Sequence, residues 1–258
     1  MSTPGKMTVD LSGKVALVTG GSRGLGREMV LAFAECGADV MITSRKLDVC
    51  DELAAEVRER YGVRVGTHAC HVGHWDELPG LVDATIHQLG KISILVNNAG
   101  LSPLYPSLGE VTEELYDKVF DVNLKGPFRL SALTAEHMVA GEGGSIINIS
   151  SVASLRVTWK ELPYAAAKGG LNIITEGFAN AYGPKVRANT IVAGPFLTDI
   201  SKAWDMERFD KLAQNFALER GGQPNEIVGA ALYLASDASS FTTGAQIVVD
   251  GGMAASFF

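Results

Sequence analysis

Three side chains in the middle of the chain have types and spacing that can support proton transfer. Tyr164 and Lys168 are four residues apart in a segment that favours a helix, and Ser151 lies thirteen residues before the tyrosine. Residues four apart share one face of a helix, so a phenol would lie beside an ammonium. The pKa of tyrosine is ordinarily about 10, and a nearby cation lowers it towards the range useful in acid/base catalysis. We therefore expect Tyr164 to act as a proton donor and acceptor.

A glycine-rich turn near the amino terminus is the second feature that points to chemistry. Residues 15–19 read Val-Ala-Leu-Val-Thr, and Gly20, Gly24 and Gly26 follow directly. Glycines allow a tight turn and close backbone approach to a ligand, and the amino end of the next helix offers unpaired N–H groups to an anion. The pattern predicts a dinucleotide pyrophosphate site; the alternative is a structural turn without a ligand. The same turn supplies three further candidate contacts: Ser22, Arg23 and Leu25.

The end of the second expected strand indicates which nucleotide would bind. An NAD site usually has an acidic residue there, which accepts the ribose hydroxyl protons, and residues 43–46 contain none. Arg45 can instead offer a planar guanidinium group to a 2′-phosphate, with help from Ser44 and from Arg23. We therefore predict NADP(H) as the cofactor. The alternative is that Arg45 and Lys46 are a solvated pair in a loop.

The order of apolar and amphipathic stretches predicts the framework that positions these residues. The expected strands are residues 15–19, 39–43, 63–69, 92–97, 145–150, 187–192 and 246–249. The expected helices are residues 25–36, 47–61, 75–89, 113–139, 164–182 and 224–235. Strands that alternate with helices predict an α/β protein with a Rossmann-like, doubly wound parallel sheet of seven strands and helices on both faces.

We expect a single domain over residues 1–258, because no repeat, low-complexity tract or shift in composition marks a boundary. Residues 1–10 are polar, and we expect them to be flexible. Residues 193–222 are the least regular part of the chain. Their apolar side chains can cover a substrate as a lid, and the alternative is a short helix that packs on the domain.

Composition and charge limit the partners and the location of the protein. The net charge of −7 argues against nucleic acid and anionic membranes as partners, because both are negatively charged. No apolar run approaches the ~20 residues that a membrane-spanning helix needs, and the first ten residues lack the apolar core of a signal peptide. We therefore expect a soluble, cytoplasmic protein.

The cysteines and histidines predict neither disulfides nor a metal site. The three cysteines are odd in number and lack a Cys-x-x-Cys spacing, which suits free thiols in a reducing compartment. His68, His71 and His74 recur at every third residue, and no carboxylate or thiol group completes a coordination site around them.

Five short motifs follow one another in a fixed order along most of the chain. They are Thr19-Gly20-x-x-x-Gly24-x-Gly26, Asn97-Asn98-Ala99-Gly100, Asn123 in Asp-Val-Asn-Leu, Ser151, and Tyr164-x-x-x-Lys168. In this order they resemble the motifs of the short-chain dehydrogenase/reductase family, and the similarity runs from residue 11 to residue 252. The resemblance implies an oxidoreductase that interconverts a carbonyl and a secondary alcohol by hydride transfer with NADP(H).

The resemblance also implies a role for each motif. Tyr164 would be the general acid/base, and Ser151 would hold and polarise the substrate carbonyl. Lys168 would bind the nicotinamide ribose and lower the pKa of Tyr164, and Asn123 would position a water in a proton relay. These roles agree with elementary chemistry, because hydride addition leaves negative charge on the carbonyl oxygen, which needs hydrogen-bond donors and then a proton.

Further nucleotide contacts are implied at His71, Val72, Asn98, Ala99, Gly100, Tyr164, Lys168, Phe196 and Thr198. We expect the Asn98 amide to tie neighbouring strands together as well. Two stretches depart from the family pattern. His71 stands where many members have Asp or Asn before the valine, and residues 193–198 read Ala-Gly-Pro-Phe-Leu-Thr where the family usually has Pro-Gly.

The substrate and the oligomeric state rest on the resemblance alone. The sequence is similar both to 3-oxoacyl-carrier-protein reductases and to sugar or polyol dehydrogenases, and the family implies a homotetramer. Because an acyl carrier protein is acidic, a basic entrance would favour the first class, and Arg129 and Arg156 are the scattered candidates. The candidate pocket residues fit either class: Ser102, Leu104, Arg156, Trp159, Leu197 and Trp204.

A protein that binds NADP without catalysis, as a redox sensor or scaffold, is the alternative from another functional class. The presence of Ser151, Tyr164 and Lys168 argues against it, because a sensor does not need a proton relay.

Overall fold

The computed structural model describes residues 9–199, 201 and 205–256. Seven parallel strands form one sheet in the order β3-β2-β1-β4-β5-β6-β7. The strands are β1 (Val15–Thr19), β2 (Asp39–Ser44), β3 (Val65–Ala69), β4 (Ile94–Asn97), β5 (Gly144–Ser151), β6 (Val186–Ala193) and β7 (Gln246–Val249). The fold class predicted from the sequence is confirmed. The first eight residues of the segment expected to be flexible lie outside the described residues.

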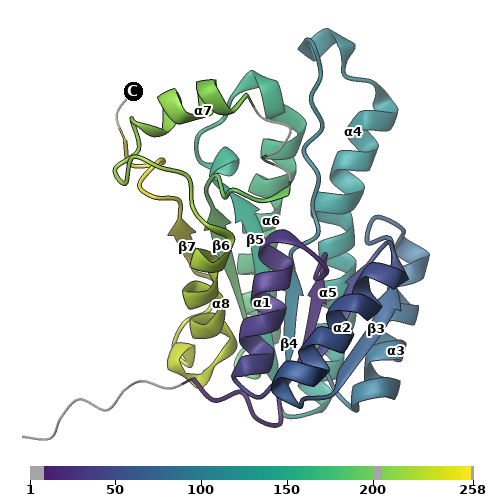
Figure 1. Ribbon diagram of the computed structural model, residues 1–258. Coiled ribbons are helices and arrows are strands. Elements are labelled where there is room, and N and C mark those ends of the chain that lie inside the picture. The colour runs from purple at the N-terminus through teal and green to yellow at the C-terminus, as the bar shows by residue number, and fades with distance from the viewer. Residues whose placement is uncertain (1–8, 200, 202–204, 257–258) are drawn as a thin grey trace, which may run out of the picture.

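Helices cover both faces of the sheet (Figure 1). On one face lie α1 (Gly24–Glu35), α2 (Leu47–Tyr61) and α8 (Val228–Ala235); on the other lie α3 (Leu78–Leu89), α5 (Gly126–Ala140) and α6 (Leu162–Tyr182). Strand β1 explains the two layers, because its side chains alternate between them. Ala16 and Val18 join one apolar core and Val15 and Leu17 join the other, so the strand is buried on both faces.

The helix predicted over residues 113–139 is helical throughout, but it is not a regular α-helix along its whole length. The structure has α4 (Glu113–Phe120), a π-helical turn over Asp121–Lys125, and then α5. Pro127, at the start of α5, has no N–H to donate to the preceding turn. Gly126 also lies so close to the segment after β3 that a Cβ atom there would be 2.0 Å from the Val72 carbonyl oxygen. A tertiary contact therefore accompanies the change of helix type.

Two other expected helices begin with a 3-10 turn. Residues Trp75–Glu77 precede α3, and Pro224–Ile227 precede α8.

The segment between β6 and α8 is the one for which the sequence allowed either a lid or a short packed helix. It contains α7 (Met206–Ala213), which lies above the carboxyl ends of β5, β6 and β7 in Figure 1. Its movement as a lid stays a prediction, and Trp204 lies outside the described residues.

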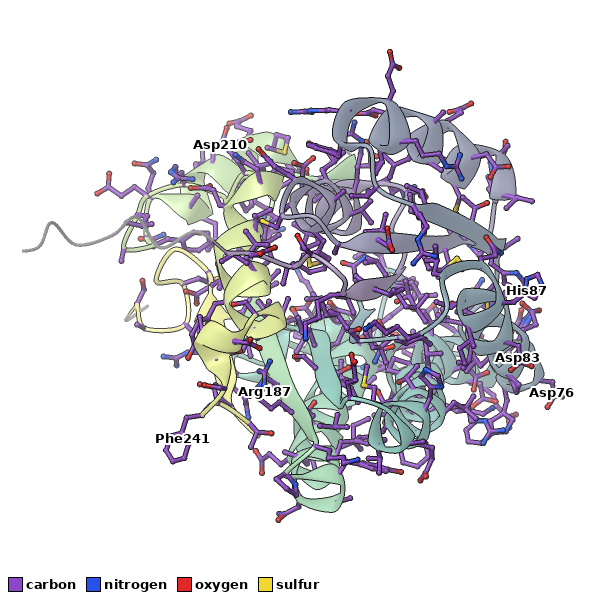
Figure 2. The ribbon with its side chains drawn as sticks, turned by 90° about the horizontal axis from the view of Figure 1, so that it is seen from below. Asp76, Asp83, His87, Arg187, Asp210 and Phe241 are labelled. Atoms are coloured by element: carbon purple, nitrogen blue, oxygen red, sulfur yellow. The ribbon has the colours of Figure 1, made fainter. Side chains whose placement is uncertain are left out.

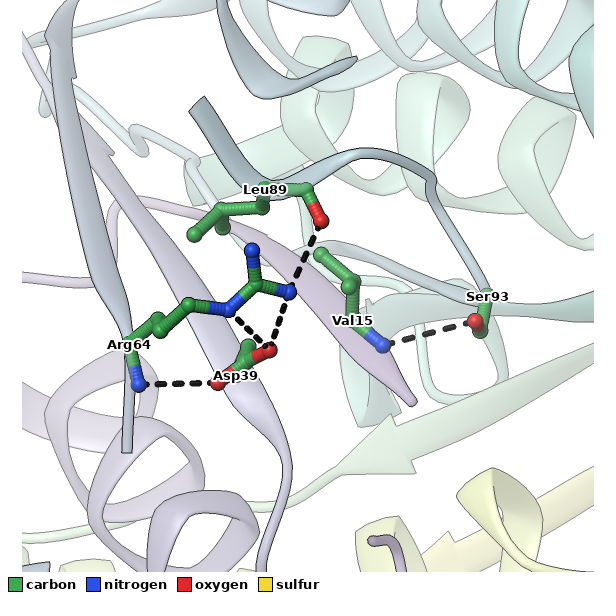
Figure 3. Close-up of polar contacts among 5 residues, drawn as sticks. All are labelled: Val15, Asp39, Arg64, Leu89 and Ser93. Carbon is green, nitrogen blue, oxygen red and sulfur yellow. Dashed lines mark hydrogen bonds and ion pairs between the residues drawn. The ribbon is translucent and has the colours of Figure 1, made fainter. Parts of the chain in front are cut away.

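Polar contacts tie the amino ends of the strands together (Figure 3). Arg64 donates from Nε and Nη2 to Asp39 Oδ2 at 2.9 and 2.7 Å, and from Nη2 to the Leu89 carbonyl at 3.0 Å. The Val15 N–H donates to Ser93 Oγ at 3.3 Å. These bonds hold β1 and β2 to the segments that enter β3 and β4.

Throughout the described part of the chain, no helix combines the length and the apolar character needed to cross a membrane.

Candidate active site

The sheet has a topological switch point between β1 and β4, where the strand order reverses. Doubly wound sheets bind ligands at the carboxyl ends of the strands at such a point. Thr19 Oγ1, at the end of β1, accepts hydrogen bonds from the Asn98 N–H at 2.9 Å and the Ala99 N–H at 3.1 Å. Asn98 Nδ2 donates back to the carbonyls of Thr19 and Gly20, at 2.9 and 3.2 Å. The expected link between neighbouring strands through Asn98 is confirmed.

The glycine-rich turn has the geometry of a phosphate cradle. Gly20 and Gly24 have φ values of 61° and 53°, a region that other residues rarely adopt. A Cβ atom at Gly26 would lie 2.2 Å from the Gly20 carbonyl oxygen and 2.6 Å from Asn98 Nδ2, so only glycine fits there. The first turn of α1 contains no acidic side chain, which leaves its N–H groups available to an anion. Thr198 lies next to Gly24 and brings the loop after β6 to the cradle.

The candidate 2′-phosphate residues lie at the end of β2 and in the glycine turn. Arg23 and Arg45 are exposed, and neither has an ion-pair partner among the residues that the structure describes. Ser44 Oγ donates to the Lys46 carbonyl at 3.0 Å and accepts from the Lys46 N–H at 3.3 Å. The two guanidinium groups are therefore available to a phosphate, whereas the Ser44 hydroxyl already shapes its own loop.

The segment after β3, where the adenine is expected, is held by local contacts of His71. The His71 N–H donates to Glu77 Oε2 at 2.7 Å, Nδ1 accepts from the Gly73 N–H at 3.2 Å, and the ring stacks on His74 at 4.1 Å. Burial lowers the pKa of His71, and the charges of His74 and Arg45 act in the same direction. This ring is engaged with its own turn, and contacts of His71 and Val72 with adenine stay predictions.

Helix α6 brings Tyr164 and Lys168 to the end of β5. Lys168 Nζ donates to the Ile149 carbonyl at 2.7 Å, and Ser150 Oγ donates to the Lys168 carbonyl at 3.2 Å, so the helix is bonded to the strand. The Lys168 ammonium lies 5.7 Å from the centroid of the Tyr164 ring. Ser151, the last residue of β5, accepts a hydrogen bond from the Ala153 N–H at 3.2 Å, and its side chain is close enough to Tyr164 to act on the pKa of the phenol. The three predicted residues therefore meet.

The expected lowering of the Tyr164 pKa by Lys168 is not found. Burial raises the pKa of Tyr164 to about 12; the hydrogen bond with Ser151 opposes this shift, and the charge of Glu161 adds to it. Burial also lowers the pKa of Lys168 to about 8. Lys168, whose ammonium bonds to the Ile149 carbonyl, is not among the groups that shift the Tyr164 pKa, and desolvation dominates there. Tyr164 is consequently protonated at neutral pH, as a proton donor must be.

Asn123 is buried in the π-helical turn Asp121–Lys125. Turns of this kind often mark functional sites. Its Nδ2 donates to the carbonyls of Leu101 and Val119 at 2.8 and 2.9 Å, and its Oδ1 accepts from the Leu101 N–H at 3.2 Å. A Cβ atom at Gly100 would lie 2.9 Å from Asn123 Oδ1 and 3.6 Å from Lys168 Nζ. Both polar groups therefore border the position above Gly100, and the water relay stays a prediction.

The other residues expected in the nucleotide site or the substrate pocket differ in their burial and in their partners. Phe196 packs into the core with 6% of its surface exposed, and its contact with a nucleotide stays a prediction. Leu104 and Trp159 are 82% and 50% exposed. Arg156 donates from Nε to the Ala254 carbonyl at 2.9 Å, and Arg129 lies 4.7 Å above the ring of Trp75. Because these arginines have separate partners, they do not form a basic entrance together.

Two residues at this site were not predicted from the sequence. Glu161 ends the 3-10 turn Trp159–Glu161 that leads into α6, and its carboxyl group is half-buried. The signal was its position directly before the expected helix, three residues ahead of Tyr164. The Tyr105 hydroxyl donates to the Trp159 carbonyl and accepts from the Leu162 N–H at 2.8 Å, and thereby joins the loops that follow β4 and β5.

A hollow in the described part of the molecule lies away from these side chains. It has a volume of about 660 Å³ and lies beside the amino end of β3, between Arg58, Arg64 and His87. Two of its charged groups are already engaged, since Arg58 donates to the Val65 carbonyl and Arg64 pairs with Asp39. The candidate site is formed by Ser151, Tyr164 and Lys168, and this hollow is no part of it.

Comparison with known proteins agrees with this geometry. The model of a family described as enoyl-(acyl carrier protein) reductase matches residues 20–254. The chain belongs to the short-chain dehydrogenase/reductase family, whose members are oxidoreductases that act on alcohols and carbonyls.

Individual relatives differ in the substrates that their names give. D-threitol dehydrogenase of Mycolicibacterium smegmatis is 35% identical over 94% of this chain and 93% of its own length. The 3-oxoacyl-[acyl-carrier-protein] reductase FabG of Thermotoga maritima is 33% identical over 94% of this chain and 98% of its own. The structure of NADPH-dependent 3-quinuclidinone reductase from Rhodotorula rubra has a TM-score of 0.90 at 30% identity, and covers 98% of this chain and 96% of that one.

Proposed function

We propose that this protein is a cytoplasmic NADP(H)-dependent oxidoreductase that interconverts a ketone and a secondary alcohol by direct hydride transfer. The observation that carries the proposal is the meeting of Ser151, Tyr164 and Lys168 at the carboxyl end of β5, on the same edge of the sheet as the glycine cradle. The proposed chemistry and the proposed nucleotide binding would thus share one edge of the sheet.

The residues of the site divide the work of the reaction. Ser151 and Tyr164 would donate hydrogen bonds to the carbonyl oxygen, where negative charge develops. Tyr164 would then give its proton to that oxygen, which its high pKa allows at neutral pH. Lys168 and the glycine turn would hold the nucleotide. When bound, the nicotinamide would supply the hydride in reduction and accept it in oxidation.

NADP(H) is proposed over NAD(H) because the end of β2 carries an exposed guanidinium group and no carboxylate. Arg45 and Arg23 are both exposed and can form charge-assisted hydrogen bonds to a 2′-phosphate. The similarity to the NADPH-dependent reductase of Rhodotorula rubra supports the same choice.

Transfer of deuterium from labelled NADPH tests the proposed reaction. The protein would be incubated with NADPH deuterated at C4, in separate stereoisomers, and with a panel of ketones, sugars and 3-oxoacyl thioesters. We expect one stereoisomer to deliver deuterium to the carbinol carbon of the product, as mass spectrometry would detect. Failure to oxidise NADPH with any member of the panel, or a product that is never labelled, would contradict direct hydride transfer.

We also propose that the protein assembles as a homotetramer through its long helices and its carboxyl-terminal segment. Large apolar side chains exposed on α4, α5 and α6 support this proposal: Tyr116, Phe128 and Ile173.

A further inference from the structure

The turn that follows Ser151 is closed by a second serine, which has no part in the mechanism above. Ser154 Oγ donates to the Ser151 carbonyl at 2.7 Å, across the 3-10 turn Val152–Ser154. The same turn holds the other polar group of Ser151, because Ser151 Oγ accepts from the Ala153 N–H at 3.2 Å. The backbone carbonyl and the hydroxyl group of Ser151 are therefore both bonded to one short turn.

Helix α6 reaches this turn through Asn172. Asn172 is 6% exposed, and its Nδ2 donates to Ser154 Oγ at 3.0 Å. A hydroxyl group that accepts from the amide keeps its own hydrogen for the Ser151 carbonyl, so the three groups form a directed chain from α6 to Ser151. Asn172 is eight residues after Tyr164 and four after Lys168 within α6, so all three side chains lie on one face of the helix.

The Asn172 amide contributes little to the stability of the fold. Its Oδ1 is buried and accepts no hydrogen bond from any residue that the structure describes. A buried acceptor without a donor costs about 1–3 kcal/mol, which offsets the bond that Nδ2 makes. An apolar side chain of similar size would therefore suit the fold about as well. Residues kept at a cost in stability are typical of functional sites, and the group that this amide holds is the turn after Ser151.

We propose that Ser154 and Asn172 are positioning residues that orient the Ser151 hydroxyl toward the substrate carbonyl. This inference rests on the proposed oxidoreductase function. Because Ser151 Oγ accepts from the Ala153 N–H, its own hydrogen remains available to a bound carbonyl oxygen. A shift of the turn would move both the oxygen and the direction of that hydrogen. Small misplacements of a group that contacts the reacting atoms can reduce the rate by up to about a hundredfold.

Removal of the Ser154 hydroxyl tests the proposal. In Ser154→Ala, we expect kcat for reduction of cyclohexanone by NADPH to fall about tenfold, while the Kd for NADPH stays unchanged. Ser154→Thr keeps the hydroxyl group and should restore most of the activity. Ser145→Ala is the matched control, because Ser145 Oγ also donates to a backbone carbonyl at 2.7 Å, that of Leu234, at the amino end of β5. This control should keep the wild-type kcat.

Two further measurements separate positioning from a general structural role. In the Ser151→Ala background, Ser154→Ala should have no further effect on kcat, because the group that it positions is gone. Asn172→Leu should lower kcat without lowering the urea concentration at which the protein unfolds, since it also removes the unpaired acceptor. Equal factors of loss for Ser154→Ala in both backgrounds would overturn the proposal.

Infrared difference spectra of cyclohexanone, labelled with ¹³C at the carbonyl and bound together with NADP⁺, provide a readout that needs no turnover. Hydrogen bonds from Ser151 and Tyr164 should lower the frequency of the carbonyl band, and this shift should shrink in Ser154→Ala but not in Ser145→Ala. If ketones are reduced but neither kcat nor the band depends on Ser154, the positioning role is wrong and the oxidoreductase function stands. If no ketone is reduced and the band still depends on Ser154, the positioning role stands and the proposed function fails. Absence of both effects would overturn both.

Discussion

At the scale of single residues, Lys168 is a side chain whose burial is unfavourable for stability. It is 3% exposed, its Nζ donates to the Ile149 carbonyl, and burial lowers its pKa from 10.5 to about 8. A buried ammonium loses hydration that one carbonyl does not replace. This arrangement is consistent with a residue kept for the nucleotide and not for the fold, since stability and activity often conflict at such sites.

Replacement of Lys168 should stabilise the protein in a manner that depends on pH. Between the folded pKa of about 8 and the unfolded value of 10.5, the unfolded chain binds more protons, so the stability of the wild type rises with pH. The unfavourable contribution is fully present below pH 8, where it amounts to at most about 3 kcal/mol. Lys168→Met should therefore unfold at higher urea concentration than the wild type at pH 7, with a smaller difference at pH 9.5. A difference that does not change with pH would contradict this account.

Arg45 should determine the choice between the two nucleotides. Arg45→Ala removes a guanidinium group from the expected 2′-phosphate position, so the KM for NADPH should rise about tenfold while the KM for NADH changes little. Steady-state kinetics with both nucleotides would measure this. Lys46→Ala is the matched control, because it removes the neighbouring charge of the same loop. Equal effects of Arg45→Ala on both nucleotides would support the solvated loop pair instead.

At this scale, sequence motifs predicted the members of the site but not their electrostatics. The spacing of Tyr164 and Lys168 correctly placed them on one helix face. It did not reveal that the ammonium bonds to Ile149 or that burial dominates at the phenol, because both depend on the packing of α6 against β5. Glu161 was missed for the same reason, since a glutamate before a helix is usually a solvated residue.

At the scale of elements, buried hydrogen bonds fix α6 to the sheet. Asn97 Nδ2 on β4 donates to Asn148 Oδ1 on β5 at 2.8 Å, and Asn148 Nδ2 donates to Thr175 Oγ1 on α6 at 2.8 Å. Thr190 Oγ1 on β6 donates to the same Thr175 oxygen at 3.1 Å. A satisfied buried network of this kind holds a helix in one position. Periodicity predicted α6 itself, but these partners are far apart in sequence and no local pattern links them.

The π-helical turn between α4 and α5 shows the opposite limit of sequence patterns. Apolar periodicity continued across residues 113–139 and gave one helix, whereas the structure inserts the π-helical turn that holds Asn123. Gly126 and Pro127 were the local signals. Their meaning depends on the carbonyl of Val72, which packs against Gly126 from another part of the chain.

Substitution of Gly126 tests the close contact with the Val72 carbonyl at the π-helical turn. A methyl group at Gly126 would overlap the Val72 carbonyl, so the backbones must separate. Gly126→Ala should lower the free energy of unfolding by about 1–3 kcal/mol. It should also weaken NADPH binding, because Val72 belongs to the expected adenine segment. Gly80→Ala on α3 meets no atom within 4 Å and should be neutral or stabilising by up to about 1 kcal/mol. Equal effects of the two changes in denaturant titrations would contradict the packing explanation.

At the scale of the whole molecule, the alternation of strands and helices was enough to predict the sheet and the edge that carries the site. Parallel strands joined by helices allow few topologies, and the glycine turn identifies the first strand. The alternation of strands and helices does not predict which apolar side chains are exposed on the surface. Ile173 on α6 is 71% exposed and Phe241 is fully exposed before β7, where it projects from the body of the protein (Figure 2). A helical pattern alone does not say whether such side chains meet water or a second copy of the chain.

The proposed homotetramer can be tested through α6. Ile173→Glu should place a charge in the interface and dissociate the tetramer, because burial of an unpaired carboxylate is strongly unfavourable. Sedimentation velocity of the wild type and the variant would measure the change. Glu59→Gln, on α2, should leave the mass unchanged. A wild-type protein that sediments as a monomer would contradict the proposal.

Turnover of Tyr164→Phe, measured together with its affinity for NADPH, tests whether Tyr164 donates the proton. The substitution keeps the ring and removes only the hydroxyl group that would donate the proton. We predict that kcat for ketone reduction falls about 10²- to 10⁴-fold, while the Kd for NADPH, measured by fluorescence, stays within about twofold of the wild type. Undiminished turnover in this variant would contradict the assignment of Tyr164 as the proton donor.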